Sequence, residues 1–461
     1  MKPKNKIILG SLVLGVMFLC VACTNLIEWR GGGIPKLVWG KSGPNIGKLK
    51  QQRKQDSVQE NSGESLTLEE ETTKPSWTHF RGLNGEAIYT EQPILTDWPK
   101  EGPPVLWRKL IGGGHSSFSI ANGLAFTIEQ QENNEVIAAF STSTGSTQWT
   151  HEYAAKFEEY FGGIGPRTTP TWDQGRLFTL GAKGHLHCLD AGSGKLLWEK
   201  NLMTENDAEV PYWGVSASPF IYKDTVIITP GGKEDNAIVA LNKKTGEKVW
   251  GALNGVQTYS TPVLFNLLGK EQLIVSLKEE MAAINPNDGK LLWSHPWKIF
   301  MNNYNIAQPT RLADDIVLIS AGYGKGAEAF RIISSEGSMR TESLWKSKSL
   351  KSKFSSPIFW KGYLYGLNEN RLVCLDAKDG SLKWRGDKYG YGQVIAASGQ
   401  LIIMGDAGDL ALVEMNPAKF VGKANFKALK GGRTWNYPAL DNGFLFVRNS
   451  YEMVCFDLRV K

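Results

Sequence analysis

Short runs of alternating hydrophobic and polar residues, separated by turn residues, recur along much of the chain. The stretch from Gly165 to Leu202 shows the pattern, because strand-like runs at 176–180 and 185–189 are bounded by the turn pairs Gln174-Gly175 and Ser193-Gly194. Such runs between turn residues predict a small meander of short strands. A single meander cannot bury both of its faces, so it needs copies of itself stacked alongside.

Tryptophan marks the copies. In five repeats a tryptophan stands four residues after a turn glycine, as Trp198 does after Gly194. Elsewhere the turn carries an insertion or is missing, and at the last position phenylalanine replaces tryptophan. The markers are 39 to 52 residues apart and comprise Trp107, Trp149, Trp198, Trp250, Trp293, Trp345, Trp384 and Phe426. A period in the forties with four short strands per unit predicts an all-β propeller.

The two ends of the repeat region are complementary fragments. The unit after Phe426 stops without an outer strand, and residues 105–110 form an orphan strand ahead of the first full unit. Pairing the two fragments closes the ring and removes its open edge. We therefore expect a single closed propeller of eight four-stranded blades. Seven blades are the alternative, because the unit after Gly392 has the weakest markers.

Residues 1–23 have the character of an export signal. Lysines precede an uncharged apolar run that ends at Ala22, and Cys23 follows. This order is typical of a signal peptide, and the junction resembles a bacterial lipobox, which implies that Cys23 is lipidated. An uncleaved anchor over residues 7–27 and simple secretion are the alternatives. All three place the bulk of the protein outside the cytoplasm, on the periplasmic face of a bacterial membrane if it is anchored.

Composition separates a tether from a folded domain. Residues 24–76 are rich in charged, Ser and Thr residues and predict a flexible tether, whereas residues 77–461 make up the propeller. The whole chain is 41% hydrophobic and 21% charged, as in globular proteins. Its net charge is +6, with no basic stripe interleaved with aromatics, so we expect no nucleic-acid partner.

The opening of the folded region and its repeats together resemble a known family. The segments Trp77-Thr-His-Phe-Arg-Gly82 and Gly165-Pro-Arg-Thr-Thr-Pro170, with the tryptophan repeats, resemble the pyrroloquinoline-quinone (PQQ) repeat family of quinoprotein-like eight-bladed propellers, in particular an extracytoplasmic bacterial subgroup. The resemblance extends over about residues 77–461. It implies the fold more strongly than any chemistry, because many members bind no quinone, and the outer-membrane assembly lipoprotein of this fold is one of them.

Two classes of function follow from the resemblance. Quinoprotein dehydrogenases of the family need a calcium-bound quinone on the ring axis and a carboxylate base, and they commonly carry adjacent cysteines; this chain has no Cys-Cys pair. We therefore expect a membrane-anchored binding or assembly scaffold, a monomeric propeller that binds a protein or peptide partner. We assign it no catalytic residue, no metal and no cofactor. The alternatives are a PQQ- and calcium-dependent dehydrogenase of the alcohol type and a small-ligand-binding propeller.

The loops that enter the innermost strands predict the position of a binding site. In a propeller these loops gather around one mouth of the axis, and here they are rich in aromatic and arginine residues, the types that dominate recognition sites. Arg167 and Arg433 are expected to favour an anionic group. The alternative is that the aromatics merely plug the axis. The predicted residues are His115, Arg167, Tyr212, Trp213, Tyr259, Asn303, Tyr304, Phe354, Tyr391, Arg433 and Trp435.

Cysteine and histidine give weaker signals. Cys188 and Cys374 lie ten residues before a marker tryptophan, where other repeats have alanine, so we interpret them, with Cys455, as small buried core residues. His185 and His187 alternate along one strand and share a face. No third ligand is obvious nearby, so we expect a packed or surface pair and not a metal site.

Overall fold

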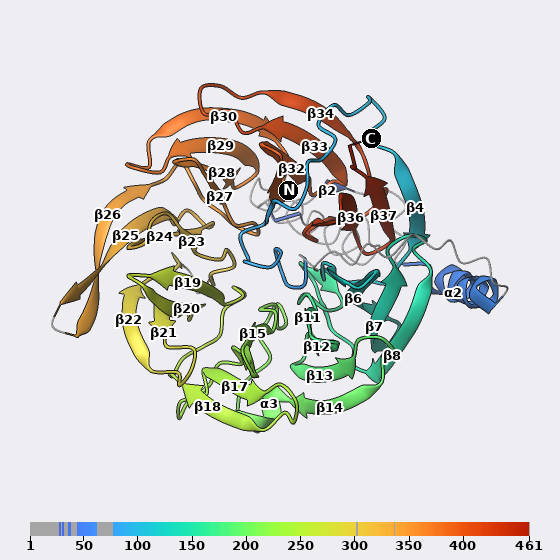
Figure 1. The fold of residues 1–461 in the computed structure, drawn as a ribbon, viewed down its shortest axis with the longest axis horizontal. Helices are drawn as coiled ribbons and strands as arrows, with labels where there is room; N and C mark the ends of the chain where they lie inside the picture. Colours follow the sequence, from blue (N-terminus) through green and yellow to red (C-terminus); the bar gives the residue numbers. More distant parts are fainter. Residues whose placement is uncertain are drawn as a thin grey trace, which may run out of the picture.

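The strands of this protein form a ring of antiparallel sheets around a central axis (Figure 1). The computed structural model describes residues 27–28, 30–31, 36–37, 44–61, 77–300, 303–335 and 337–460. Within these residues the sheets comprise eight blades, so the predicted all-β, eight-bladed propeller is confirmed. The seven-blade alternative is wrong, because the unit after Gly392 forms a complete blade.

Each blade is a four-stranded meander whose last strand lies on the outside of the ring (Figure 1). We number the blades in chain order. Blade 1 consists of β5 (Ser119–Ala121), β6 (Leu124–Gln131), β7 (Asn134–Ser141) and β8 (Thr147–Ala154), and blade 2 of β11 (Thr171–Asp173), β12 (Arg176–Leu180), β13 (His185–Asp190) and β14 (Leu196–Asn201). Blade 3 consists of β15 (Phe220–Tyr222), β16 (Thr225–Ile228), β17 (Ile238–Asn242) and β18 (Lys248–Ala252), and blade 4 of β19 (Val263–Leu267), β20 (Lys270–Ser276), β21 (Glu280–Ile284) and β22 (Leu291–Pro296).

The second half of the ring repeats this order, and blade 8 takes its outer strand from the N-terminal side of the domain. Blade 5 consists of β23 (Thr310–Arg311), β24 (Ile316–Ala321), β25 (Gly326–Ser335) and β26 (Ser338–Ser347), and blade 6 of β27 (Ile358–Trp360), β28 (Tyr363–Asn368), β29 (Arg371–Asp376) and β30 (Leu382–Lys388). Blade 7 consists of β31 (Gln393–Ala397), β32 (Gln400–Met404), β33 (Asp409–Glu414) and β34 (Gly422–Lys427), and blade 8 of β35 (Ala439–Asp441), β36 (Phe444–Arg448), β37 (Glu452–Asp457) and β4 (Val105–Leu110).

The marker tryptophans join neighbouring blades at the outer rim. Trp107 donates its indole N–H to the carbonyl of Thr142 in the next blade at 2.8 Å, and its ring covers Gly145 of the same turn. A Cβ on Gly145 would lie 2.6 Å from that ring. Trp149 and Gly194 repeat the contact one blade further on. The tryptophan and the glycine recur together in most blades because the tryptophan packs on the turn of the following blade. Trp293 is an exception, since its indole donates to Gln272 of its own blade at 2.7 Å and no atom lies within 4 Å of a Cβ on Gly337.

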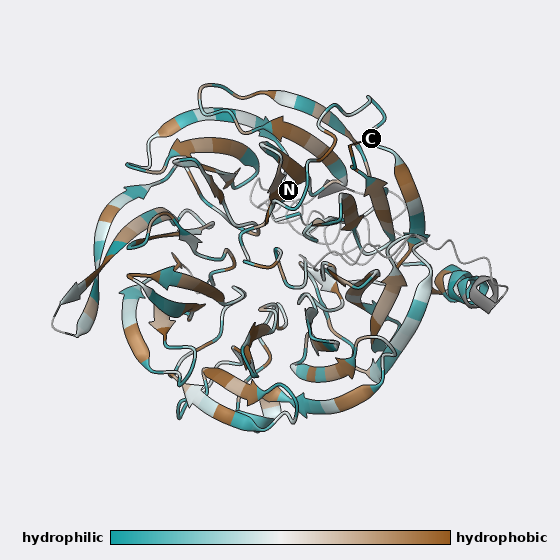
Figure 2. Cartoon of the chain, viewed as in Figure 1, coloured by the Kyte–Doolittle hydropathy of each residue, from teal (hydrophilic) through white to brown (hydrophobic). Residues whose placement is uncertain are grey.

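Hydrophobic residues fill the blades and the spaces between them. The middle strands are buried almost throughout, whereas outer strands such as β8 alternate between half-buried and exposed residues. Figure 2 shows the same contrast, with brown prevailing on most inner strands and mixed colours on the rim. The side chains of adjacent blades interdigitate, as Phe126 and Ile137 of blade 1 do with Leu177 and Leu189 of blade 2.

The segment that precedes β4 crosses the ring axis (Figure 1). Backbone carbonyls of Trp77 and Thr78 accept hydrogen bonds from the inner strands of blades 1 and 2. Arg81, which is buried, reaches the other side and donates to the Gln308 side chain at 3.1 Å. β3 (Ile88–Tyr89) then pairs in parallel with β31 of blade 7. The axial channel is therefore closed at one end.

A helix packs outside the ring where blades 8 and 1 meet. α2 (Ile46–Asn61) lies beside β4 and β8, inside the segment expected to be a tether, and Leu49 on it is buried. Gln52 exchanges two side-chain hydrogen bonds with the backbone of Leu110 on β4. The sequence of α2 is polar on nearly every face, so no amphipathic pattern predicted a helix here. Among the described residues, no helix is both long and apolar enough to cross a bilayer.

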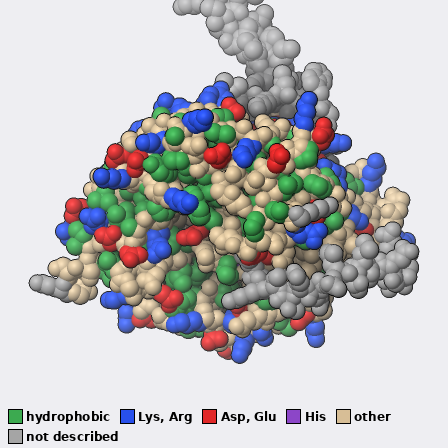
Figure 3. Space-filling model, turned by 45° about the horizontal axis from the view of Figure 1, so that its top comes forward, with side chains coloured by type: hydrophobic (Ala, Val, Ile, Leu, Met, Phe, Trp, Pro, Cys, Tyr) green, Lys and Arg blue, Asp and Glu red, His purple; other side chains and the backbone are tan. Residues whose placement is uncertain are grey.

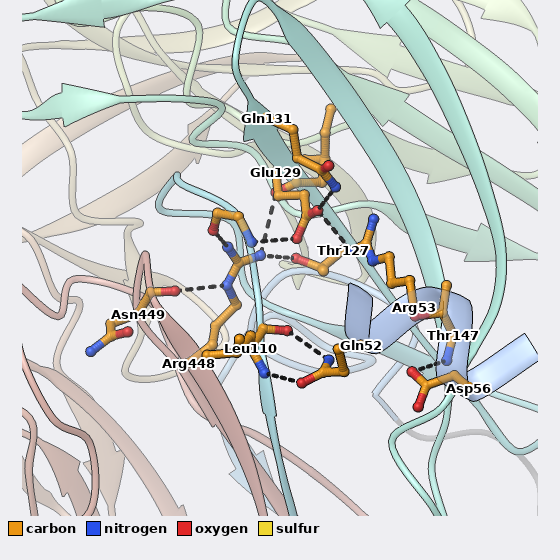
Figure 4. A network of polar contacts seen from close by, with 12 residues as sticks. Gln52, Arg53, Asp56, Leu110, Thr127, Glu129, Gln131, Thr147, Arg448 and Asn449 are labelled. Carbon is orange, nitrogen blue, oxygen red and sulfur yellow. Dashed lines mark hydrogen bonds and ion pairs between the residues drawn. The ribbon is translucent and has the colours of Figure 1, made fainter. Parts of the chain in front are cut away.

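A buried polar network joins α2 to the boundary between blades 8 and 1, which we call the seam (Figure 4). Arg448 of blade 8 donates to the Thr127 hydroxyl at 2.7 Å and to the carbonyl of Gly112 at 3.0 Å. Glu129 of blade 1 accepts the N–H of Gly112 at 2.7 Å and pairs with Arg53 of α2 at 2.7 Å. Arg448 and Glu129 are fully buried, so water cannot take over the hydrogen bonds that they make. These charged side chains therefore join blade 8 to blade 1 at the seam.

Candidate functional site

A cavity of about 380 Å³ lies at the open end of the axis, opposite the crossing segment. Phe80 of that segment and Tyr437 form part of its lining, with their rings 5.0 Å apart. The predicted mouth residues that line it are His115, Arg167, Trp213, Tyr259, Asn303, Phe354 and Trp435. We call this cavity the axial mouth.

The other predicted residues do not line the cavity but lie beside residues that do. Each packs on a residue that lines the mouth, at ring-centroid or charge-to-ring distances of 4.6 to 5.8 Å. These residues are Tyr212 on Trp213, Tyr304 on Tyr259, Tyr391 on Phe354 and Arg433 on Trp435. The structure therefore brings the whole predicted set together at one end of the axis.

A hairpin that sequence reasoning missed forms one wall of the mouth. β9 (Glu158–Glu159) pairs with β10 (Gly163–Ile164), and Glu159 and Phe161 face the cavity. Arg167 fixes this hairpin: its guanidinium donates to Glu159 at 3.3 Å and to the carbonyl of Gly163 at 2.9 Å. The run Tyr-Phe-Gly-Gly at 160–163, apolar within a polar loop, was the available signal.

Arg433 also holds the hairpin. Its guanidinium donates to the carbonyl of Phe161 and stacks on the ring of Trp435 at 4.6 Å. Together with the contacts of Arg167, this engages both predicted arginines in internal hydrogen bonds. Burial, more than any nearby charge, lowers the pKa of each guanidinium, for Arg167 to about 10.

Lys353 is a cation in the mouth lining that was not predicted from sequence. Its ammonium group lies 4.4 Å from the centre of the Tyr323 ring and 4.9 Å from that of Tyr391. Aromatic faces attract such a cation, and the attraction grows as water is removed. Burial lowers the pKa of Lys353 from its usual value.

His115 sits between the hairpin and Trp435. Its Nε2 lies 2.8 Å from the carbonyl of Gly162, and its ring centre lies 5.2 Å from that of Trp435. Burial, followed by the charges of Arg167 and Arg433, holds the pKa of His115 well below its usual value. The ring is therefore neutral, and because a carbonyl only accepts, the proton resides on Nε2.

Large aromatic side chains stand exposed around the mouth. Tyr212 and Tyr160 have relative exposures of 61% and 55%, and Phe300, with 75%, lines an adjoining hollow that shares Tyr323 with the mouth. Tyr160, Phe161, Trp213 and Tyr212 form a continuous chain of ring contacts between 4.8 and 5.7 Å. Charged residues of both signs are interspersed over the face seen in Figure 3, without a single dominant field.

The lining residues do not fit a calcium-bound quinone. Calcium takes six to eight oxygen ligands, with carboxylates prominent among them. Among the described residues that line the mouth, the acidic one is Glu159, and its carboxylate is already paired with Arg167. Nor do the described residues include a group of three or more His, Cys, Asp or Glu side chains arranged to hold a metal.

The predicted histidine pair and the three described cysteines lie away from the mouth. His187 and His185 pack between blades 1 and 2 against Tyr153, with His151 added from β8. Cys188, Cys374 and Cys455 are buried and free, and burial raises the pKa of the Cys188 and Cys374 thiols to about 12. Such thiols are packing groups and not nucleophiles.

Comparison with known proteins places the chain in a family. The family model described as outer membrane protein assembly factor BamB matches residues 132–386, more than half of the chain, and the chain belongs to this family. The resemblance to PQQ-repeat propellers is thereby confirmed. The BamB protein of Yersinia pestis is 22% identical over 301 residues, which cover 60% of this chain and 70% of the relative.

Enzymes of the same fold are also similar. Quinoprotein alcohol dehydrogenase PedH of Pseudomonas putida is 27% identical over 143 residues, but these cover 29% of this chain and 23% of the enzyme. Among solved structures, BamB from Moraxella catarrhalis has a TM-score of 0.56 at 14% identity, covering 77% of this chain and 99% of that chain. Quinohemoprotein alcohol dehydrogenase from Comamonas testosteroni has a TM-score of 0.60 at 12% identity, with 90% and 85% covered. At these identities the structures support the fold alone.

Proposed function

We propose that this protein is an extracytoplasmic scaffold in the assembly of outer-membrane proteins and that it binds a protein partner at the axial mouth without a quinone. Membership of the family supports the assembly role, since its relatives in Yersinia pestis, Moranella endobia and Shewanella oneidensis carry the name of an assembly factor. The partner-binding role rests on the mouth itself.

The exposed aromatic rim carries the proposal. Tyr160, Tyr212 and Phe300 have most of their area in water, although each is large enough to stabilise a core if it were buried. Soluble proteins seldom leave such residues gathered around a concavity unless a partner covers them. Aromatic residues dominate the binding energy of protein interfaces. We therefore expect the ligand to be a protein surface that enters the axial mouth and covers these exposed aromatic residues.

The anchor and the domain boundaries belong to the same proposal. Residues 1–23 would be the export signal, 24–76 the segment that joins the anchor to the ring, and 77–461 the propeller, with Cys23 lipidated. Cys23 and the apolar run before it lie outside the described residues. Cys23→Ser should abolish fatty-acid labelling and leave an unprocessed precursor. A wild-type protein that is never labelled and keeps its N-terminus would instead favour the membrane span.

Photo-crosslinking tests the mouth directly. A photoreactive amino acid at position 212 should crosslink one defined partner in the native envelope, and the same residue at Val249 on the outer rim should not, although Val249 is also exposed. With the purified partner, the double variant Tyr212→Ser/Phe300→Ser should bind at least about tenfold more weakly, equivalent to about 1.4 kcal/mol. Equal affinity of the double variant and the wild type would refute a rim-centred site.

Titration with quinone and calcium tests the alternative enzyme class. Because the lining lacks carboxylates available for calcium, we expect no saturable change in absorbance and no rise in the melting temperature. A saturable shift that requires both quinone and calcium would favour a dehydrogenase instead.

A further inference from the structure

Residues from the N-terminal side of the chain lie in the axial mouth. β1 (Ile27–Glu28) pairs with β2 (Lys36–Leu37), and Gly31, which follows β1, is part of the cavity lining. Glu28 is buried, with a relative exposure of 2%, and its charge acts on Arg433 and Tyr451 of the ring. These residues belong to the segment that would connect the anchor to the propeller.

A close fit surrounds Gly31. Lys353 donates a hydrogen bond from its ammonium group to the carbonyl of Gly31. The glycine has φ +84°, and a Cβ there would lie 2.7 Å from the ring of Tyr391 and 2.8 Å from that of Phe354. Only glycine combines this backbone conformation with this approach of two rings.

Charge complements the fit. Glu28 pairs with Arg30 at 2.7 Å, and its negative charge opposes the fall in the pKa of Arg433 that burial causes. The segment therefore places a carboxylate on the Arg433 side of the mouth and a backbone carbonyl on Lys353. An extended peptide with an acidic side chain would offer the same two groups.

We propose that residues 27–28 and 30–31 are an internal occupant of the axial mouth and that the partner inserts an extended peptide with an acidic side chain in their place. This inference rests on the proposed function, because it assigns the chemistry of the partner to the same site. The partner must displace the segment, so its apparent affinity is reduced by the fraction of molecules in which the segment is seated.

Gly31→Val should expel the segment while leaving the propeller residues that line the mouth unchanged. The probe is a fluorescein-labelled synthetic peptide with the sequence of residues 24–33, titrated by fluorescence anisotropy into the full-length protein. Gly31→Val should bind it about tenfold or more tightly than wild type. Gly269→Val is the matched control, because Gly269 also has positive φ but no atom within 4 Å of the added Cβ, so it should bind the peptide as wild type does.

Two further measurements identify the contacts. Adding Lys353→Met to Gly31→Val should reverse the gain in affinity, and a peptide with glutamine in place of its glutamate should bind Gly31→Val more weakly. Equal affinity of wild type and Gly31→Val, or no binding to either, would overturn the internal occupant. Crosslinking at position 212 would still report on the proposed function, so the two failures can be told apart.

Discussion

The outer rim and the axial mouth of this propeller are built in opposite ways. At the rim, the tryptophan of one blade covers the turn glycine of the next, as Trp107 covers Gly145 and Trp149 covers Gly194. At the mouth, each loop contributes a different side chain, and an inserted hairpin and the N-terminal segment add to the wall. Regular packing therefore closes the ring, whereas irregular loops provide the side chains that line the binding site.

The seam between blades 8 and 1 departs from the regular rim, and breaking it should have the largest effect. Arg448→Met removes a buried charge that four backbone and side-chain acceptors share and that faces Glu129. We expect a loss of about 3–5 kcal/mol in the free energy of unfolding, measured with urea. Arg53→Met should lose roughly half as much, because Glu129 then keeps its bond from Gly112 and its attraction to Arg448. Equal losses would contradict this ranking.

The histidines between blades 1 and 2 make the rim sensitive to pH. Burial, reinforced by His151 and His185, lowers the pKa of His187 from about 6.5 to about 3. Below pH 6.5 the unfolded chain therefore binds a proton that the folded protein excludes. The contribution of His187 to the free energy of unfolding is fully present above pH 6.5. It falls as the pH drops toward 3, by about 1.4 kcal/mol per pH unit for one such group.

Thermal melting between pH 7 and pH 4 checks this dependence. His187→Gln should flatten the decline in stability relative to wild type, because glutamine does not titrate. His79 is half-buried, and burial also lowers its pKa. His79→Gln therefore shows whether the effect belongs to the inter-blade cluster or to any histidine with a lowered pKa. An unchanged pH profile in His187→Gln would remove His187 as the cause.

What could be read from the sequence follows the same division. The offset of four residues between Gly194 and Trp198 recurs in five repeats because most rim contacts share one geometry, so periodicity predicted the eight-bladed ring. The loops that gather at the mouth could be placed by their position in each repeat. Their contacts could not, because the hairpin carrying Phe161 and the cation of Lys353 occur once and have no counterpart in other blades.

The rim contact itself can be measured by comparing two glycines. Gly194→Val forces a side chain into the ring of Trp149, whereas Gly175→Val adds the same side chain at a similar positive φ with nothing within 4 Å. The backbone strain is shared, so the difference isolates the overpacking, for which we expect about 1–3 kcal/mol in urea unfolding. If both variants lost the same stability, the tryptophan would not be what selects glycine here.

The smallest global effect is expected at the mouth, from the arginine that holds the hairpin. Arg167 packs 4.5 Å over the ring of Phe157 and bonds Glu159 and the carbonyl of Gly163, all within one loop. Replacing Arg167 by methionine and Glu159 by glutamine removes the charge pair without leaving a buried charge, so unfolding free energy should change by less than about 0.5 kcal/mol. The hairpin loses the hydrogen bonds that Arg167 makes to it, so its backbone amides should exchange hydrogen faster, whereas those of β12 and β13 should not. Uniformly faster exchange would mean that the arginine supports the ring as a whole, and the separation between a regular rim and an adaptable mouth would fail at this residue.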